Sequence, residues 1–245
     1  MYKNMFTDYS DKILSLNNFE KSDILTDKFL LHRENNLEIY YAPHNEYINK
    51  DARVFIIGIC PGWTQTQIAY KTANEGLKNN LPFEKIQKQC KHNSRFAGSM
   101  RKNLIEMLDE LGLHRYLSVS CCADLFDNDN NLLHTTSVLP FPVFINNKNY
   151  TGHNPDILKS NLLSSYVEEY FYPEAKLLSD ALIIPLGKSV DDVLDDMVKK
   201  QIIKPDNILF GFPHTSGANG HRRKQFDANR EFFASVIDNH FKNII

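Results

Sequence analysis

The sequence predicts an α/β protein: a three-layer α/β/α sandwich around a central, mostly parallel sheet of about four strands. Short apolar, β-branched runs alternate along the chain with segments that have helical spacing. The run at 54–57 is apolar on both faces, as in a strand buried inside a parallel sheet. The length of 245 residues suits one domain, 1–245, with residues 1–50 as an N-terminal extension packed on it.

Short apolar runs bounded by Gly, Pro or Asn predict the strands, and apolar residues every three or four positions predict the helices. The expected strands are 37–42, 54–57, 116–121, 135–139, 181–186 and 207–210. The expected helices are 71–93, 98–113, 154–179 with a break at Pro173, 189–200, and one at the C-terminus. We interpret the lysines of 71–93 as a solvated helix face.

Composition limits the function classes. The chain has 28 Lys and Arg against 30 Asp and Glu, which argues against bulk binding to nucleic acid but allows a local basic patch. No apolar run approaches a membrane span and the N-terminus is not a signal peptide, so we expect a cytoplasmic protein without a membrane partner. The four cysteines lack disulfide or metal spacing, and adjacent Cys121 and Cys122 suit one tetrahedral ion poorly. We expect free thiols, no metal and no cofactor.

The first candidate for an active site is the turn after the 54–57 strand. The strand breaks at Gly58, Pro61-Gly62 turns the chain, and a helix follows with Thr64 as its expected N-cap. Such a turn presents backbone N–H groups at the carboxyl edge of a sheet, where α/β proteins bind ligands.

A second cluster follows the 207–210 strand. His214 lies just past the strand's carboxyl end, so it would share an edge with the first turn. The small polar loop 216–219 can present donors to an anion, and the basic run 221–224 suits phosphate contacts. The alternative is a hydrogen-bonded turn histidine followed by a solvated helix start.

Three motifs in order resemble those of the uracil-DNA glycosylase superfamily. Its first motif is a strand followed by Gly-x-x-Pro-Gly, here 58–62, and its last is a strand followed by His-Pro-Ser, here His214-Thr215-Ser216. Several branches carry Phe-x-Gly before a helix, here Phe96-Ala97-Gly98. The resemblance covers roughly residues 53–239.

The resemblance implies a DNA glycosylase of base excision repair, a monomer that hydrolyses the N-glycosidic bond of uracil or another deaminated base in DNA. His214 would donate a hydrogen bond to the base as negative charge develops on it. Phe96 would stack on the extruded base. The turn that would hold the catalytic water comprises Gly58, Cys60, Pro61 and Gly62. The other base-binding candidates are Ser137, Trp63 and Gln65. The phosphate-binding candidates are Ser216, Gly217, Asn219, Arg222 and Arg223. The wedge that fills the gap in the DNA would be Phe141 or Phe144.

The chain departs from the family pattern at several positions. Ile59 and Cys60 stand where members place Asp, Asn or Glu to orient water, and Ser99 stands where one branch has an acid. Ser137 stands where many members read uracil with Asn. The alternative function is therefore a catalytically inactive member that binds nucleic acid or a free nucleobase. The sequence has no Gly-x-Ser-x-Gly and no P-loop, which argues against an unrelated hydrolase or nucleotide-binding enzyme.

Overall fold

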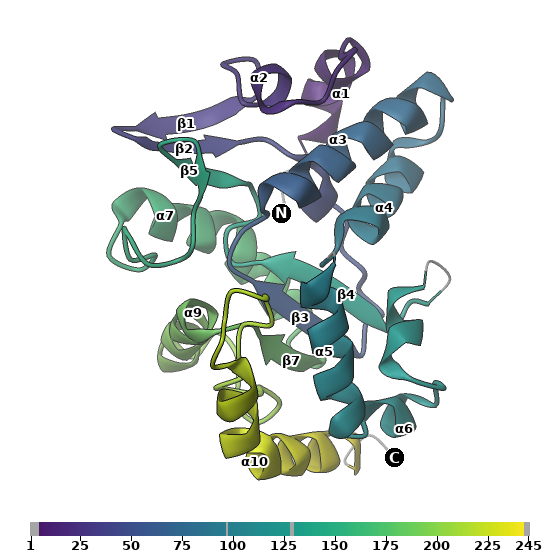
Figure 1. Ribbon diagram of the computed structural model, residues 1–245, viewed down its shortest axis with the longest axis vertical. Coiled ribbons are helices and arrows are strands. Elements are labelled where there is room, and N and C mark those ends of the chain that lie inside the picture. Colours follow the sequence, from purple (N-terminus) through teal and green to yellow (C-terminus); the bar gives the residue numbers. More distant parts are fainter. Residues whose placement is uncertain (1–4, 97, 128–129, 243–245) are drawn as a thin grey trace.

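The structure is a computed structural model that describes residues 5–96, 98–127 and 130–242. Within these residues the chain is a mixed α/β protein with two sheets (Figure 1). One is a three-stranded parallel sheet in the order β4-β3-β7. Its strands are β3 (Val54–Gly58), β4 (Leu133–Ser137) and β7 (Leu182–Pro185). A single parallel bridge from Ile183 to Ile208 continues the sheet beyond β7.

Helices cover both faces of the parallel sheet, which explains the continuous apolar run in β3. Val54 and Ile56 join one apolar cluster, whereas Phe55 and Ile57 join another. The first cluster includes side chains of α5 (Ser99–Glu110), α6 (Leu113–Leu117) and α10 (Arg222–Lys242). The second includes side chains of α3 (Trp63–Lys78), α4 (Phe83–Ser94), α7 (Asn161–Tyr166), α8 (Tyr172–Leu177) and α9 (Lys188–Lys199).

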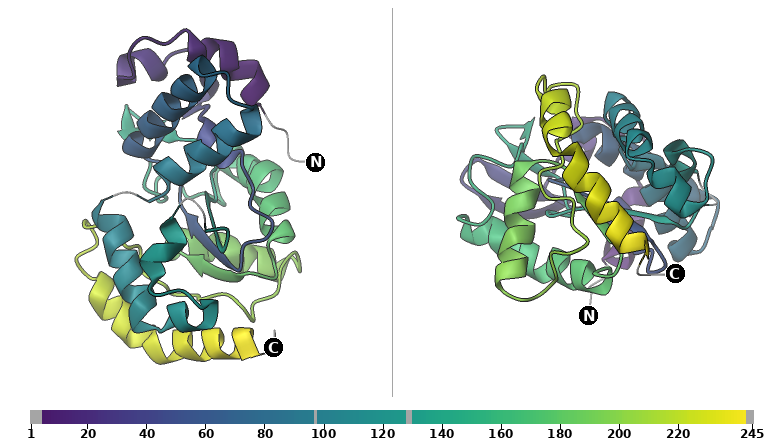
Figure 2. Two further views of the ribbon diagram at one scale, coloured as in Figure 1. Left: turned by 90° about the vertical axis from the view of Figure 1, so that its right-hand side faces the viewer. Right: turned by 90° about the horizontal axis from the view of Figure 1, so that it is seen from below.

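The second sheet is antiparallel and joins the N-terminal segment to the middle of the chain. Its strands, in spatial order, are β1 (Leu30–Glu34), β2 (Leu37–Tyr40), β5 (Val143–Ile145) and β6 (Lys148–Asn149). The sequence predicts β2 alone. The strand β1 is half-buried to exposed and β6 is two exposed residues, so neither carries an apolar run, and the apolar strand β5 is only three residues long. The helices α1 (Phe6–Leu14), α2 (Lys21–Ile24), α3 and α4 lie at the same end of the molecule (Figures 1 and 2).

Four secondary-structure expectations are wrong. The helix expected at 71–93 is two helices, since α3 ends at Lys78 and α4 begins at Phe83. The expected strand at 116–121 is instead the end of α6, since Leu113 and Leu117 are buried one helical turn apart, followed by the 3-10 helix η2 (Cys122–Phe126). The expected strand at 207–210 is reduced to the bridge at Ile208. The expected helix at 154–179 begins at Asn161, where the hydroxyl of Ser160 accepts the N–H of Leu163. It then continues through the π-helical segment η3 (Val167–Phe171) into α8.

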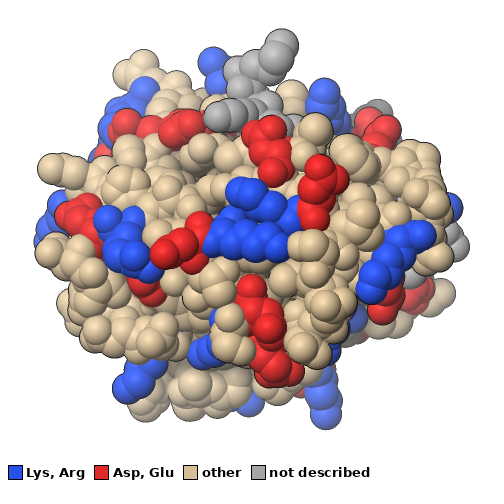
Figure 3. Space-filling view, turned by 90° about the horizontal axis from the view of Figure 1, so that it is seen from above, with Lys and Arg blue, Asp and Glu red and all other residues tan. Residues whose placement is uncertain are grey.

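Within the described residues, no helix combines the length and the apolar character needed to cross a membrane. On the face shown in Figure 3, which is the end of the molecule that carries α1 to α3, basic and acidic side chains lie interspersed. This mixture agrees with the formal net charge of −2.

Candidate functional site

The three parallel strands end at one edge of the sheet. Gly58, the last residue of β3, pairs with Ser137 at the end of β4. On the other side of β3, Ile57 pairs with Pro185 at the end of β7. The carboxyl edge of a parallel sheet is where α/β proteins bind ligands. The segments that follow these strands therefore form the candidate site.

Phe96 and Ser137 meet beside Gly58. A Cβ atom added to Gly58 would lie 3.5 Å from Cε1 of Phe96 and 3.5 Å from Oγ of Ser137. Phe96 lies between α4 and α5 with a φ of 29°, a conformation that is uncommon for residues other than glycine, and its side chain is buried. The fold thus brings together three residues that the sequence assigned to catalysis or base binding.

A small polar cavity adjoins Phe96 and Ser137. Its volume is about 10 Å³, the size of one water molecule. Gln65, a third predicted base-binding residue, also lines it. The other lining residues are His44, Asn45, Lys91, Ser94, Arg95, Thr135 and Thr136.

Lys91 and His44 are cavity residues that the sequence analysis did not identify. Lys91 is 3% exposed, and its Nζ donates to Asn45 Oδ1 at 2.9 Å and to the backbone oxygen of Thr135 at 2.7 Å. Burial lowers the pKa of Lys91 to about 8. Neither ring nitrogen of His44 has a hydrogen-bond partner among the described residues, and burial lowers its pKa to about 3. The prediction that the lysines of 71–93 form a solvated face is therefore wrong for Lys91.

A buried hydrogen-bonded pair lies close to Lys91. His134 Nε2 is 2.6 Å from Glu174 Oε1, and the hydroxyl of Thr136 donates to Glu174 Oε2 at 3.0 Å. The N–H of Asn49 donates to His134 Nδ1 at 3.3 Å, which places the proton of a neutral His134 on Nε2, facing Glu174. Burial lowers the pKa of His134, so its ring is neutral at pH 7. The carboxylate of Glu174 in turn favours the charged form of Lys91.

The turn after β3 leads directly into α3. Gly62 is the N-cap, so the expected cap at Thr64 is wrong. Gln65 Oε1 accepts the N–H of Gly62 at 3.1 Å, and Gln65 Nε2 donates to the backbone oxygen of Ser94 at 3.1 Å. Gln65 therefore connects the turn to the end of α4.

Pro61 and Cys60 form the middle of this turn. Pro61 is buried, and the thiol of Cys60 donates to the backbone oxygen of Tyr150 at 3.6 Å. Burial raises the pKa of Cys60 to about 12. The thiol is therefore protonated at neutral pH, which argues against a nucleophilic role.

His214 lies at the same edge of the sheet. A Cβ atom on Gly187, just past β7, would lie 2.9 Å from Cβ of His214. Gly187 has a φ of 94°, and its N–H donates to the backbone oxygen of Phe212 at 3.0 Å. Burial lowers the pKa of His214, which favours the neutral ring. A neutral imidazole can donate one hydrogen bond without carrying charge.

The loop that carries His214 lies beside the start of α5 (Figure 2). Asn103 Nδ2, in α5, donates to the backbone oxygen of Thr215 at 2.8 Å. A Cβ atom on Gly217 would lie 3.4 Å from Oγ of Ser99, the first residue of α5. The second cluster is thus held against the helix that follows Phe96.

The predicted phosphate-binding residues differ in their surroundings. Ser216 is half-buried and Gly217 is exposed. Asn219 uses its amide within the loop, donating to the backbone oxygen of His214 at 3.0 Å. Arg222, at the start of α10, donates to the backbone oxygen of Asn219 at 3.1 Å.

Arg223 is held by carboxylates. Its Nη2 donates to Glu110 Oε2 at 2.6 Å, and its Nε lies 3.1 Å from Asp227 Oδ1. Arg222 is therefore the better placed of the two arginines to contact a phosphate.

Trp63 contacts other residues than the remaining predicted base-binding residues do. It is absent from the described residues that line the cavity. Its N–H donates to Asn149 Oδ1 at 3.1 Å, and its ring lies 5.7 Å from Nζ of Lys21. Phe141 and Phe144 are fully buried in the core. The expectation that one of them is a surface wedge is wrong.

Two titratable groups near this edge were also not predicted from the sequence. His153 Nδ1 lies 3.5 Å from Oγ of Ser189, at the start of α9. Asp191 Oδ2 accepts the N–H of Gly211 at 3.1 Å, and burial raises the pKa of Asp191 to about 7. The motifs contain neither residue, so no local signal pointed to them.

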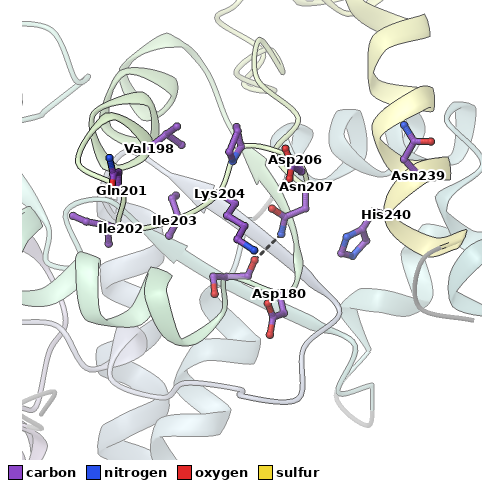
Figure 4. A pocket seen from close by; sticks show the side chains of 12 residues that line it. Asp180, Val198, Gln201, Ile202, Ile203, Lys204, Asp206, Asn207, Asn239 and His240 are labelled. Atoms are coloured by element: carbon purple, nitrogen blue, oxygen red, sulfur yellow. Dashed lines mark hydrogen bonds between the residues drawn. The ribbon is translucent and has the colours of Figure 1, made fainter.

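A larger groove of about 1210 Å³ lies at the opposite edge of the parallel sheet (Figure 4). It is lined by Asp180 and Asn207, which precede β7 and the Ile208 bridge, and by His240 of α10. Asn207 Nδ2 donates to the backbone oxygen of Ser179 at 2.7 Å. This groove is therefore separate from the candidate site.

The fold and the site define an α/β protein with a small cavity, lined largely by polar residues, at the carboxyl edge of a parallel sheet. The chain is 44% identical over 240 residues to the uncharacterized protein YoxB of Bacillus subtilis (strain 168), and the match covers 94% of each chain. It belongs to the same family as YoxB. No family model and no solved structure matches the chain.

Proposed function

We propose that the protein binds an extruded base of DNA at the carboxyl edge of the parallel sheet and hydrolyses its N-glycosidic bond. The substrate base is uracil or another deaminated base. The observation that supports this most is the meeting of the Phe96 ring and the Ser137 hydroxyl beside Gly58. An aromatic face next to a hydrogen-bonding group suits a planar polar heterocycle.

We also propose how the layers of the fold are arranged, which partner the protein binds and where in the cell it acts. The parallel sheet and the Ile208 bridge would form the four-stranded centre of a three-layer α/β/α sandwich, because apolar clusters lie on both faces of β3. DNA is the partner, the protein acts as a monomer in the cytoplasm, and catalysis uses no cofactor.

The chemistry rests on donors placed where negative charge develops. Cleavage of the bond leaves a cationic sugar and an anionic base, so His214 would donate a hydrogen bond from its neutral ring to a base carbonyl. Lys91 adds a buried ammonium group beside Ser137 in the cavity. One such preorganised donor typically contributes about 10²- to 10³-fold in rate.

Entry of a base requires movement. The cavity of about 10 Å³ has room for no more than about one water molecule and is too small for a nucleobase. The Phe96 ring, which packs against Gly58, would have to swing out of this space and then stack on the base.

The alternative is a member of the same superfamily that binds nucleic acid or a free nucleobase without cleaving it. Ile59 and Cys60 favour this alternative, because an alkyl group and a protonated thiol cannot take a proton from water.

The test uses single- and double-stranded oligonucleotides that contain uracil, hypoxanthine or xanthine, with strand scission at the resulting abasic sites as the readout. We expect cleavage by the wild-type protein, and at least about 100-fold slower cleavage by His214→Ala with DNA affinity unchanged. Binding without cleavage of any substrate would favour the alternative. Neither binding nor cleavage would exclude both functions.

A salt titration of DNA binding tests the two arginines. Arg222→Ala should reduce the magnitude of the negative slope of log affinity against log salt by about 0.9. Arg223→Ala is the matched control, since its guanidinium already lies against Glu110 and Asp227. Equal changes in the two variants would contradict a phosphate contact by Arg222.

A further inference from the structure

A cluster of metal-ligating side chains lies outside the candidate site. Asp109 at the end of α5, His114 in α6 and Cys122 in η2 each offer one ligand atom, and the three atoms lie within 4.8 Å of one another. His114 Nδ1 is 3.3 Å from Asp109 Oδ1. Ligand atoms bound to one tetrahedral zinc ion are about 3.3–3.8 Å apart, as bonds of 2.0–2.3 Å require. Small side-chain movements would therefore bring these three atoms onto one ion.

The surroundings of the three ligand atoms suit a bound cation. Nδ1 of His114 is buried and has no hydrogen-bond partner among the described residues, although it faces the carboxylate of Asp109. Cys122 is fully buried, and its backbone N–H donates to Asp109 Oδ1 at 2.7 Å. A hydrogen bond of this kind fixes a metal-binding carboxylate from outside the coordination sphere. A cation would satisfy both the nitrogen and the carboxylate.

We propose that Asp109, His114 and Cys122 bind a zinc ion, with solvent as the fourth ligand. Thiolate, imidazole and carboxylate together are a ligand set typical of zinc, whereas magnesium and calcium prefer oxygen ligands. The ion would connect α5, α6 and η2 just before the chain enters β4. Adjacent Cys121 and Cys122 suit one tetrahedral ion poorly as a pair, but the proposed site uses only Cys122, together with a histidine and an aspartate.

The first experiment measures binding by the full chain after treatment with a chelator. Zinc is titrated against a chromophoric competitor, and cobalt(II) is added separately as a spectroscopic probe. We expect one equivalent of zinc and a thiolate-to-cobalt charge-transfer band. Cys122→Ser should remove the band and weaken zinc binding at least about 100-fold, more than the loss of an outer-sphere partner usually does. Cys121→Ser, the neighbouring thiol, should keep both.

The second experiment guards against a variant that fails to fold. Asp109→Asn and His114→Gln retain the thiol and nearly the same shape, and both should lower zinc affinity. Saturating zinc should raise the Tm of the wild-type protein and of Cys121→Ser, but raise it less in the three ligand variants. The proposal is overturned if the wild-type protein binds no stoichiometric zinc, or if the charge-transfer band persists in Cys122→Ser.

Discussion

The two sides of the candidate site are held by different means. On the β7 side, backbone conformation positions His214: Gly187 leaves room for it, and Asn103 and Asn219 hold its loop through backbone oxygens. On the β4 side, buried side chains hold one another: His134 and Thr136 contact the two oxygens of Glu174, whose carboxylate also favours the charged form of Lys91.

The two sides of the site therefore differ in how much their substitution should affect stability. A glycine turn is a local feature and has a small effect on stability, whereas a buried ammonium or carboxylate costs several kcal/mol unless partners compensate it. We infer that the β7 side places a donor and that the β4 side supplies the charge. Substitutions on the β4 side should therefore mainly change stability, whereas those on the β7 side should mainly lower activity.

The largest expected effect is on the β4 side. Glu174→Ala should lower the free energy of unfolding by about 3–5 kcal/mol, because it removes the carboxylate that compensates the buried ammonium of Lys91. It also leaves His134 Nε2–H and the Thr136 hydroxyl buried without their acceptor. Denaturant unfolding measures the change. Glu169→Ala, an exposed neighbour, should change it by less than about 0.5 kcal/mol. Similar losses in both variants would mean that the buried network contributes little.

An intermediate effect is expected on the β7 side. Gly187→Ala should cost about 1–3 kcal/mol, since a side chain at a φ of 94° is strained and its Cβ would lie 2.9 Å from Cβ of His214. Because that contact displaces His214, base excision should fall more than stability does. Gly220→Ala is the control, as no atom of the described residues lies within 4 Å of its added Cβ. If Gly187→Ala unfolds more easily but cleaves DNA normally, His214 is not positioned by this glycine.

The ends of the central strands β3 and β7 were largely predictable from sequence. Gly58 and Gly187 mark strand ends because the chain turns there, and the strand at 54–57 is visible because both its faces are apolar. The mixed α/β class follows from such local signals. The strand expected at 116–121 failed because Leu113 and Leu117 are buried by helical spacing that begins before the expected strand.

The buried side chains of the β4 side could not be predicted from the sequence, for a physical reason. Its side chains come from the 3-10 helix η1 (Pro43–Asn45) and from α4, β4 and α8, and they meet only in the folded chain. Lys91 directly follows the fully buried Cys90 on α4, a weak sign that it lies at the border of the buried face. His44 sits in the N-terminal segment, which the motif resemblance does not cover, yet it lines the cavity. The N-terminal segment is therefore part of the site.

The smallest expected effect, and the most specific, is a change in how the free energy of unfolding depends on pH. The pKa of Lys91 is about 8 in the folded protein against an ordinary value of 10.5. Between these values the unfolded chain binds more protons, so this group makes stability rise with pH through that window. Below pH 8 the buried charge costs about 3 kcal/mol. Lys91→Met removes this cost but also two hydrogen bonds, each contributing about 1 kcal/mol.

Lys91→Met should therefore be more stable than the wild-type protein by about 1 kcal/mol at pH 7 and less stable at pH 10. Unfolding curves at pH 7, 8, 9 and 10 measure the difference, and Lys85→Met, exposed on the same helix, should follow the wild-type profile. A profile for Lys91→Met that runs parallel to the wild type would mean that Lys91 titrates normally. A stability gain accompanied by loss of base excision would show that the buried charge is retained for function at the expense of the fold.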